Sequence, residues 1–185
     1  MTSQKGFNNN FEVNDENYDD LRLLASQTKL DSSNPPVATS YKGGSVLAFA
    51  SNPNQKMYIT AQLPHSWDGQ DIEIHLHLAL PVAGSGGGVE NVKFDITHSW
   101  SSIGAQYPAE STITATLDVQ DELVDAHVLM EIDDIAAGGN TFSSCIIMSL
   151  ERDTGVANDY ASSVYLVDVD MHYRKDKLGS ATEEP

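Results

Sequence analysis

Residues 71–78 read Asp-Ile-Glu-Ile-His-Leu-His-Leu, with an apolar side chain at every second position. Because successive side chains on a β-strand point to opposite faces of a sheet, this period of two predicts a strand with one buried face. The same alternation occurs in residues 57–63, 92–97 and 112–117, and further strands are expected near 45–50, 125–132, 142–150 and 164–173.

Turn-forming residues separate these segments, as in Asn52-Pro53-Asn54, Gly84–Gly88 and Gly138-Gly139-Asn140. No stretch of ten or more residues shows a convincing helical period. About eight strands with such turns predict an all-β fold, an antiparallel β-sandwich with the jelly roll as the preferred topology. The order of the strands is left open.

The first 40 residues differ from the rest of the chain. They are rich in Asn, Asp and Ser and contain Asn34-Pro35-Pro36, which favours extended backbone. We interpret residues 1–40 as an extended N-terminal arm, 41–175 as the jelly-roll sandwich and 176–185 as a flexible C-terminal tail. Removal of the arm is expected to leave the sandwich folded. The arm residues expected to contact a partner subunit or a neighbouring copy are Tyr18, Asp19, Leu21, Arg22 and Leu24.

The charge of the chain is strongly negative. Ten Lys and Arg oppose 27 Asp and Glu, giving −17 over 185 residues, and no Lys or Arg occurs between Lys93 and Arg152. Such a surface repels phosphate groups, which argues against direct binding of nucleic acid or an anionic membrane. The acidic stretch is either a solvated face or a surface directed toward a basic partner or cations. No apolar run is long enough for a membrane span, and the single Cys145 fits a reducing compartment.

The most distinctive chemical feature is His75-Leu76-His77. Two histidines at this spacing share one face of a strand and could bind a divalent metal together, as in cupins, if a third ligand joined them. His98, His127, Glu73 and Asp95 are candidates for that ligand. The alternative is that His75 and His77 pair with acids on a neighbouring strand or lie at a subunit contact. We expect no cofactor and no bound metal.

No catalytic centre is evident in the sequence. His65-Ser66 and His98-Ser99 place their two side chains on opposite faces of a strand, and no Gly-x-Ser-x-Gly motif occurs. Asp168 and Asp170 share a strand face, with Val167, Val169 and Met171 expected on the opposite one. We interpret the two aspartates as exposed polar residues. The chain is therefore expected not to be an enzyme.

Several short segments together resemble a group of small virion proteins of tailed bacteriophages. The segments are Tyr18–Arg22, Leu63–Trp67, Asp68–Ile72 followed by His75–His77, Thr112–Thr116, Met171–Tyr173 and Asp176–Ser180. They span nearly the whole chain.

The resemblance implies a jelly-roll capsid cement (decoration) protein without catalytic activity. Such a protein would form a homotrimer on the outer surface of an icosahedral head and bind neighbouring subunits of the major capsid protein, after assembly in the host cytoplasm. One alternative is a tail-associated or receptor-binding jelly roll that binds glycans through a tip such as Gly84–Gly88. Another is a cupin-like metal-dependent enzyme that uses His75 and His77.

Overall fold

The computed structural model describes residues 17–23 and 28–175, and these residues form eleven strands. Their bounds are β1 (Asn17–Arg22), β2 (Thr28–Leu30), β3 (Val37–Tyr41), β4 (Gly44–Phe49), β5 (Gln55–Gln62), β6 (Trp67–Ala79), β7 (Asn91–Ser101), β8 (Ser111–Asp118), β9 (His127–Ile135), β10 (Cys145–Arg152) and β11 (Val164–Lys175). No helix that could cross a membrane occurs in this part of the chain.

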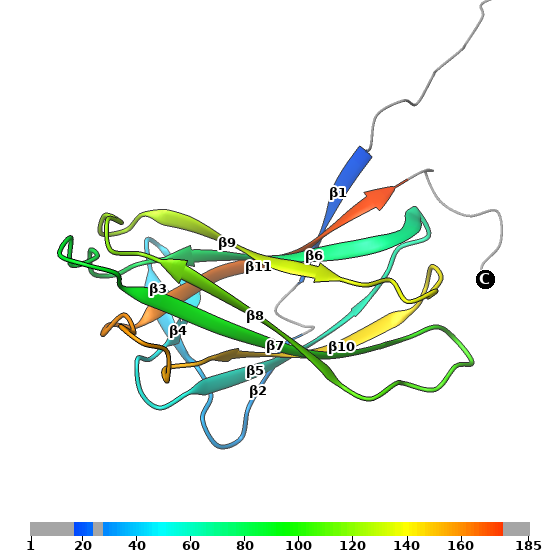
Figure 1. Cartoon of the computed structure of the whole chain (residues 1–185), viewed down its shortest axis with the longest axis horizontal. Coiled ribbons are helices and arrows are strands. Elements are labelled where there is room, and N and C mark those ends of the chain that lie inside the picture. The colour runs from blue at the N-terminus through cyan, green and yellow to red at the C-terminus, as the bar shows by residue number, and fades with distance from the viewer. Residues whose placement is uncertain (1–16, 24–27, 176–185) are drawn as a thin grey trace, which may run out of the picture.

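The strands form two antiparallel sheets packed face to face (Figure 1). The first sheet has the order β3-β4-β11-β6-β9, with β1 also paired to β11, and the second has the order β2-β5-β10-β7-β8. Strands β4 to β11 pair as β4 with β11, β5 with β10, β6 with β9 and β7 with β8. This nested pairing is that of one long hairpin rolled into a sandwich, so the expected jelly roll is confirmed.

The eight segments expected as strands are all strands, and their apolar alternate residues form the core. On β6 the side chains of Ile72, Ile74, Leu76 and Leu78 are fully buried. Between the sheets the rings of Phe49 and Phe94 meet edge to face, with 5.3 Å between centroids. The period of two therefore identified the inner face of β5, β6, β7 and β8 correctly.

The expectation that the folded body begins at residue 41 is wrong. β1 pairs with β11 from Asn17↔Lys175 to Arg22↔Asp170, β2 pairs with β5, and β3 pairs with β4. Leu23, which follows β1, is buried in the core. These short strands keep most of their side chains exposed, so they lack the apolar alternation that marks a half-buried strand. Leu24 and residues 176–185 lie outside the described residues.

Arg152 is a fully buried cation at the end of β10. Its Nη1 donates to the carbonyls of Phe49 (2.9 Å) and Ser162 (2.8 Å), and its Nη2 donates to the carbonyl of Tyr160 (2.6 Å) and lies 3.4 Å from Asp159 Oδ1. Burial lowers the pKa of Arg152 and raises that of Asp159. The guanidinium thereby joins the end of β4 to the segment that leads into β11.

Replacing Arg152 should be strongly destabilising. In Arg152→Met three carbonyl groups, two of them in buried hydrogen bonds, lose their donor, and Asp159 loses its counter-charge. We therefore expect a loss of about 3–5 kcal/mol in the free energy of unfolding, measured by guanidinium denaturation. Arg22→Met is the control, because the Arg22 side chain is 73% exposed and pairs with Asp168 at the surface, where a loss below about 1 kcal/mol is expected. Equal midpoints for Arg152→Met and the wild type would contradict this assignment.

The revised domain boundary also makes a prediction. Leu23→Ala should lower the stability of the isolated protein by roughly 2–5 kcal/mol, because it leaves a cavity in the core. Leu30→Ala, at a residue that is 48% exposed, should change stability by about 0.5 kcal/mol or less. Thermal and chemical unfolding of both variants would check this. If residues 1–40 formed a separate arm, neither substitution would affect the unfolding of the body, and their deletion would leave it intact.

Candidate functional site

Four of the six histidines of the chain lie together on the outer face of the first sheet. His75 and His77 come from β6, His127 from β9 and His172 from β11. The alternation that buries the leucines of β6 turns His75 and His77 outward, and the pairing of β6 with β9 and β11 brings the other two alongside. We call these four residues, with the outward side chains of β1, β9 and β11 beside them, the histidine face.

Asp170 lies at the centre of the histidine face and contacts two of its histidines. It is only 5% exposed, its Oδ2 lies 2.8 Å from His77 Nε2, and its Oδ1 lies 3.3 Å from His75 Nδ1. His77 Nδ1 lies 2.9 Å from His127 Nε2. A neutral His77 that donates from Nε2 to the carboxylate accepts at Nδ1, which assigns the donor role to His127 Nε2. The tautomers of His77 and His127 are thus coupled through one buried carboxylate.

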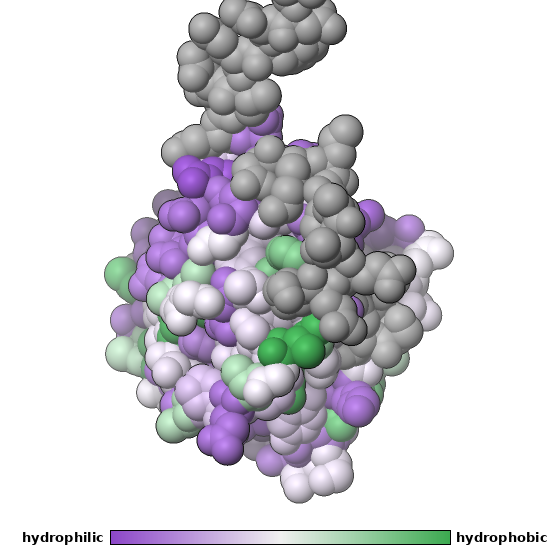
Figure 2. Space-filling model, turned by 90° about the vertical axis from the view of Figure 1, so that its right-hand side faces the viewer, coloured by the Kyte–Doolittle hydropathy of each residue, from purple (hydrophilic) through white to green (hydrophobic). Residues whose placement is uncertain are grey.

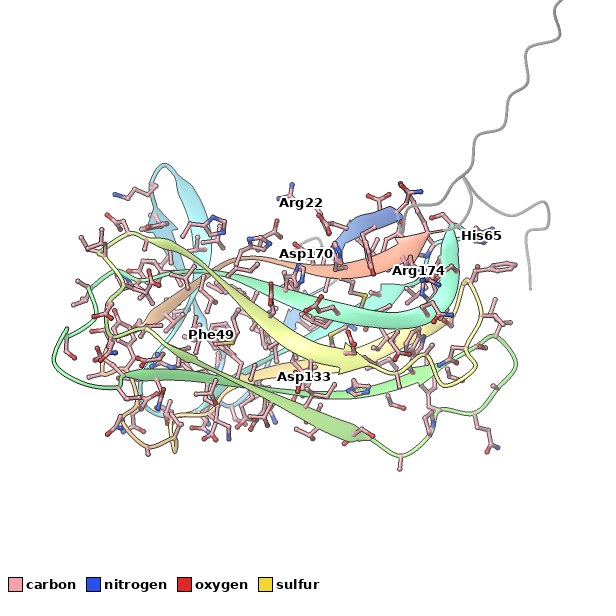
Figure 3. All side chains as sticks on the ribbon, turned by 45° about the horizontal axis from the view of Figure 1, so that its top comes forward. Arg22, Phe49, His65, Asp133, Asp170 and Arg174 are labelled. Atoms are coloured by element: carbon pink, nitrogen blue, oxygen red, sulfur yellow. The ribbon has the colours of Figure 1, made fainter. Side chains whose placement is uncertain are left out.

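The other half of the histidine face is built by β1. The Tyr18 ring stacks on His172 with 4.7 Å between centroids, and His172 stacks in turn on His75 at 5.1 Å. Asp20 Oδ1 lies 2.8 Å from His172 Nδ1, and Arg22 donates to Asp168 at 2.5 Å. The outward side chains of β1 are therefore held by those of β11. Figure 3 shows Arg22, Asp170 and Arg174 along this side of the sandwich.

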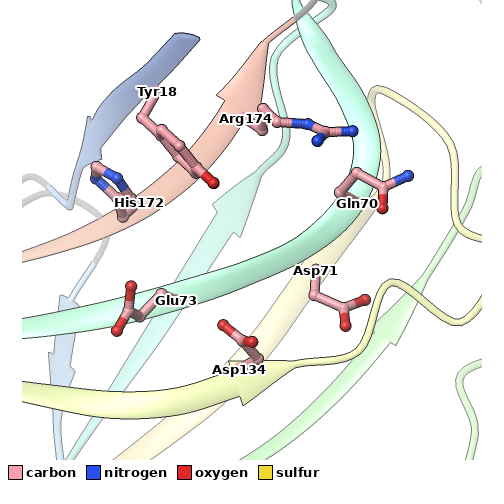
Figure 4. Close-up of a pocket in the computed structure, with 7 residues that line it drawn as sticks. All are labelled: Tyr18, Gln70, Asp71, Glu73, Asp134, His172 and Arg174. Carbon is pink, nitrogen blue, oxygen red and sulfur yellow. The ribbon is translucent and has the colours of Figure 1, made fainter. Parts of the chain in front are cut away.

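A polar pocket of about 310 Å³ adjoins the histidine face (Figure 4). Tyr18, His172 and Arg174 line one side of it. The carboxylates on the other side are held in part by the fold, since Asp71 accepts a hydrogen bond from the backbone of Ala137 at 2.8 Å. The full lining is Tyr18, Gln70, Asp71, Glu73, Asp134, His172 and Arg174.

The two ends of the described chain meet beside this pocket. Asn17 pairs with Lys175, so residues 1–16 and 176–185 join the body at the same end of the β1–β11 ribbon. Figure 2 views the molecule from this end and shows strongly hydrophilic residues gathered at the top, where β1 begins and β11 ends. Residues on the lower part of this view are mostly closer to neutral in hydropathy.

The histidine pair does not form part of a metal centre in the described residues. No group of three or more His, Cys, Asp or Glu there is arranged to hold a metal ion. Each histidine of the pair contacts Asp170 of β11 instead. This arrangement is the expected alternative, in which His75 and His77 pair with an acid on a neighbouring strand. Of the suggested third ligands, His98 and Asp95 belong to β7 in the other sheet, while Glu73 and His127 lie beside the pair.

The interpretation of Asp170 as an exposed polar residue is wrong, as is the inward placement of Val167. A register shift between Leu166 and Asp168 interrupts the alternation of β11, so Val167 is 47% exposed. After the bulge, Asp168, Asp170, His172 and Arg174 share one face, and neighbouring imidazoles cover Asp170. The ionisable residues that alternate along β11 were a sequence signal for this polar face. No sequence pattern indicated the position of the bulge.

The role of Asp170 can be tested by an isosteric change. Asp170→Asn removes the charge and one acceptor between two imidazoles, so we expect a loss of about 1–3 kcal/mol in the free energy of unfolding at neutral pH. Asp133→Asn is the matched control, because Asp133 is exposed on β9 of the same sheet and should change stability by less than about 0.5 kcal/mol. Urea denaturation of both variants is the measurement. Equal losses in the free energy of unfolding for the two variants would show that the contacts of Asp170 with the histidines do not stabilise the fold.

No protein-family model and no curated protein matches the chain. Among solved structures it is similar to the C-terminal family 22 carbohydrate-binding module of Clostridium thermocellum Xyn10B, with 9% identity over 85% of this chain and 95% of that one and a TM-score of 0.44. It is also similar to the xylan-binding module CBM15, with 8% identity over 87% of this chain and 100% of that one and a TM-score of 0.45. The family 11 carbohydrate-binding module of Clostridium thermocellum has 11% identity over 84% of this chain and 88% of that one, with a TM-score of 0.36. At these identities the likeness is one of fold alone.

Proposed function

We propose that this chain is a structural virion protein, a non-catalytic capsid cement protein of a tailed phage. One observation carries the proposal. Three of the segments that resemble phage virion proteins, Tyr18–Arg22, His75–His77 and Met171–Tyr173, are far apart in sequence but lie on the adjacent strands β1, β6 and β11. Their outward side chains form one connected surface, the histidine face, and this surface is the proposed contact with the major capsid protein.

The composition of the histidine face suits a protein partner. It combines an exposed aromatic ring (Tyr18, 50% exposed), an exposed apolar side chain (Leu129, 41%) and an arginine (Arg22). Aromatic residues and arginine are the usual anchors of protein interfaces. Several of its polar side chains are already held by neighbours, so binding would cost little further side-chain entropy.

The position of the chain ends supports the same partner. Residues 1–16 and 176–185 attach beside the histidine face, because Asn17 and Lys175 are paired. A subunit bound at that face would therefore also lie beside the paired ends of the β1–β11 ribbon. Many such contacts, repeated by a trimer on a symmetric shell, would give tight attachment from individually weak interactions. The charge of −17 would keep the protein from competing for packaged DNA.

Copy number and position in the virion test this proposal. Quantitative mass spectrometry and electron cryomicroscopy of phage particles that carry this protein should find hundreds of copies, as trimers on the outer head surface. Light scattering of the purified protein should give the mass of a trimer. A few copies at the tail would instead support a receptor-binding module, and absence from the particle would overturn a virion role altogether.

Variants of the histidine face test the proposed contact. The double variant Tyr18→Ala, Arg22→Ala should bind heads that lack the protein at least tenfold more weakly than the wild type, because it removes the exposed aromatic and arginine anchors. The matched control is Thr60→Ala, Thr116→Ala, at two exposed residues on the other sheet. Thermal unfolding would verify that both variants are folded. Equal occupancy of heads by the two variants would refute this contact.

A further inference from the structure

A second groove lies on the opposite side of the sandwich, on the outer face of the second sheet. It has a volume of about 680 Å³ and runs between Tyr58 on β5 and Tyr107 in the β7–β8 connection. Its floor comes from β10 and β7, which lie between them. We call it the tyrosine groove, and we propose that it binds a neutral oligosaccharide. This inference does not depend on attachment to a phage head.

The strand register sets the shape of the tyrosine groove. Ser149 of β10 pairs with Tyr58 on one side and with Thr97 on the other, so these three residues form one row across the sheet. With neighbouring strands about 4.8 Å apart, Tyr58 and Thr97 are separated by roughly 10 Å of open floor. Beyond Thr97 the β7–β8 connection forms the second wall, because the Ser99 hydroxyl donates to the carbonyl of Pro108 at 2.9 Å.

The Tyr58 wall is held in place before any ligand binds. The Tyr58 hydroxyl donates to Asp31 Oδ1 at 2.8 Å, and the other carboxylate oxygen of Asp31 accepts from the backbone N–H groups of Ser33 (2.8 Å) and Asn34 (3.0 Å). These hydrogen bonds lower the pKa of Asp31 to about 2, so the acceptor stays ionised at neutral pH. Tyr58 remains 40% exposed. A fixed and exposed aromatic ring offers contact area at a low entropic cost.

The other groups of the groove match the chemistry of sugar hydroxyls. In the part of the chain that the structure describes, the Ser149 hydroxyl and the Glu110 carboxylate have no hydrogen-bond partner, and both line the groove. A hydroxyl can donate and accept, and a carboxylate accepts, so each can pair with a sugar hydroxyl. The tyrosine rings supply apolar faces for the C–H faces of the sugar. Aromatic faces combined with a few placed polar groups are typical of a small-molecule site.

The charges at the tyrosine groove favour an uncharged ligand. Lys56 at the edge of the groove is matched by Glu151, whose Oε2 lies 2.5 Å from its Nζ. Glu110 is the remaining charged side chain among the lining residues. A groove with one unpaired carboxylate on a protein of charge −17 would repel nucleic acid and acidic glycans. A neutral oligosaccharide avoids this repulsion.

Titration of the full chain with neutral hexasaccharides tests the inference. A panel of gluco-, xylo-, manno- and galacto-configured hexasaccharides should include at least one ligand by isothermal titration calorimetry. For that ligand, Tyr58→Ala and Tyr107→Ala should each weaken binding at least tenfold. Tyr58→Phe should stay within a few-fold of the wild type, because it keeps the ring. Tyr18→Ala, on the histidine face, is the matched control and should bind like the wild type.

Three outcomes would overturn the proposal. One is the absence of binding by every hexasaccharide at millimolar concentration. The second is a ligand whose affinity is lowered by Tyr18→Ala but not by Tyr107→Ala, which would place it at the histidine face. The third is binding restricted to anionic glycans. None of these results bears on head attachment, so the tyrosine groove and the proposed virion role can fail separately.

Discussion

The buried guanidinium of Arg152 is the interaction on which the rest of the structure depends. A cation with no exposed surface needs acceptors inside the protein, and here three backbone carbonyls and Asp159 supply them for Nη1 and Nη2, while the buried Nε has no partner among the described residues. Because those carbonyls belong to the end of β4 and to the segment before β11, the ion fixes where β11 begins. β11 is the strand that pairs with β1, β4 and β6. An error in its position would disturb the whole first sheet.

The histidine face follows from this placement of β11. The bulge after Leu166 resets the alternation, so that Asp168, Asp170 and His172 all point outward while Val169 and Met171 remain in the core. Asp170 then becomes buried between two imidazoles of β6, with its Oδ2 2.8 Å from His77 Nε2 and its Oδ1 3.3 Å from His75 Nδ1. β1 adds the stacked Tyr18 ring at the other end. The result is one connected network of polar and aromatic side chains that links β1, β6, β9 and β11.

The two outer faces of the sandwich are chemically different. The first carries histidines and charged groups that are largely paired with one another. The second carries two exposed tyrosine rings and hydroxyl groups, with Lys56 neutralised by Glu151. A jelly roll permits this division, because each sheet uses one face for the shared core and leaves the other free to vary. The two faces of one domain can therefore differ in chemistry without any change to the core.

The sequence by itself determined the eight half-buried strands, the inner face of most of them and the outward direction of His75 and His77, because alternation is a local property of the chain. It did not reveal β1, β2 and β3, whose exposed side chains give no apolar period. Only the tertiary structure brought Asp170, His127 and His172 to the histidine pair, and Tyr58 and Tyr107 to one groove. Those contacts depend on strand order and on a one-residue bulge, which join residues that are distant in sequence and leave no local pattern. The burial of Arg152 was decided in the same way, since three of its acceptors are backbone carbonyls that any residue could provide.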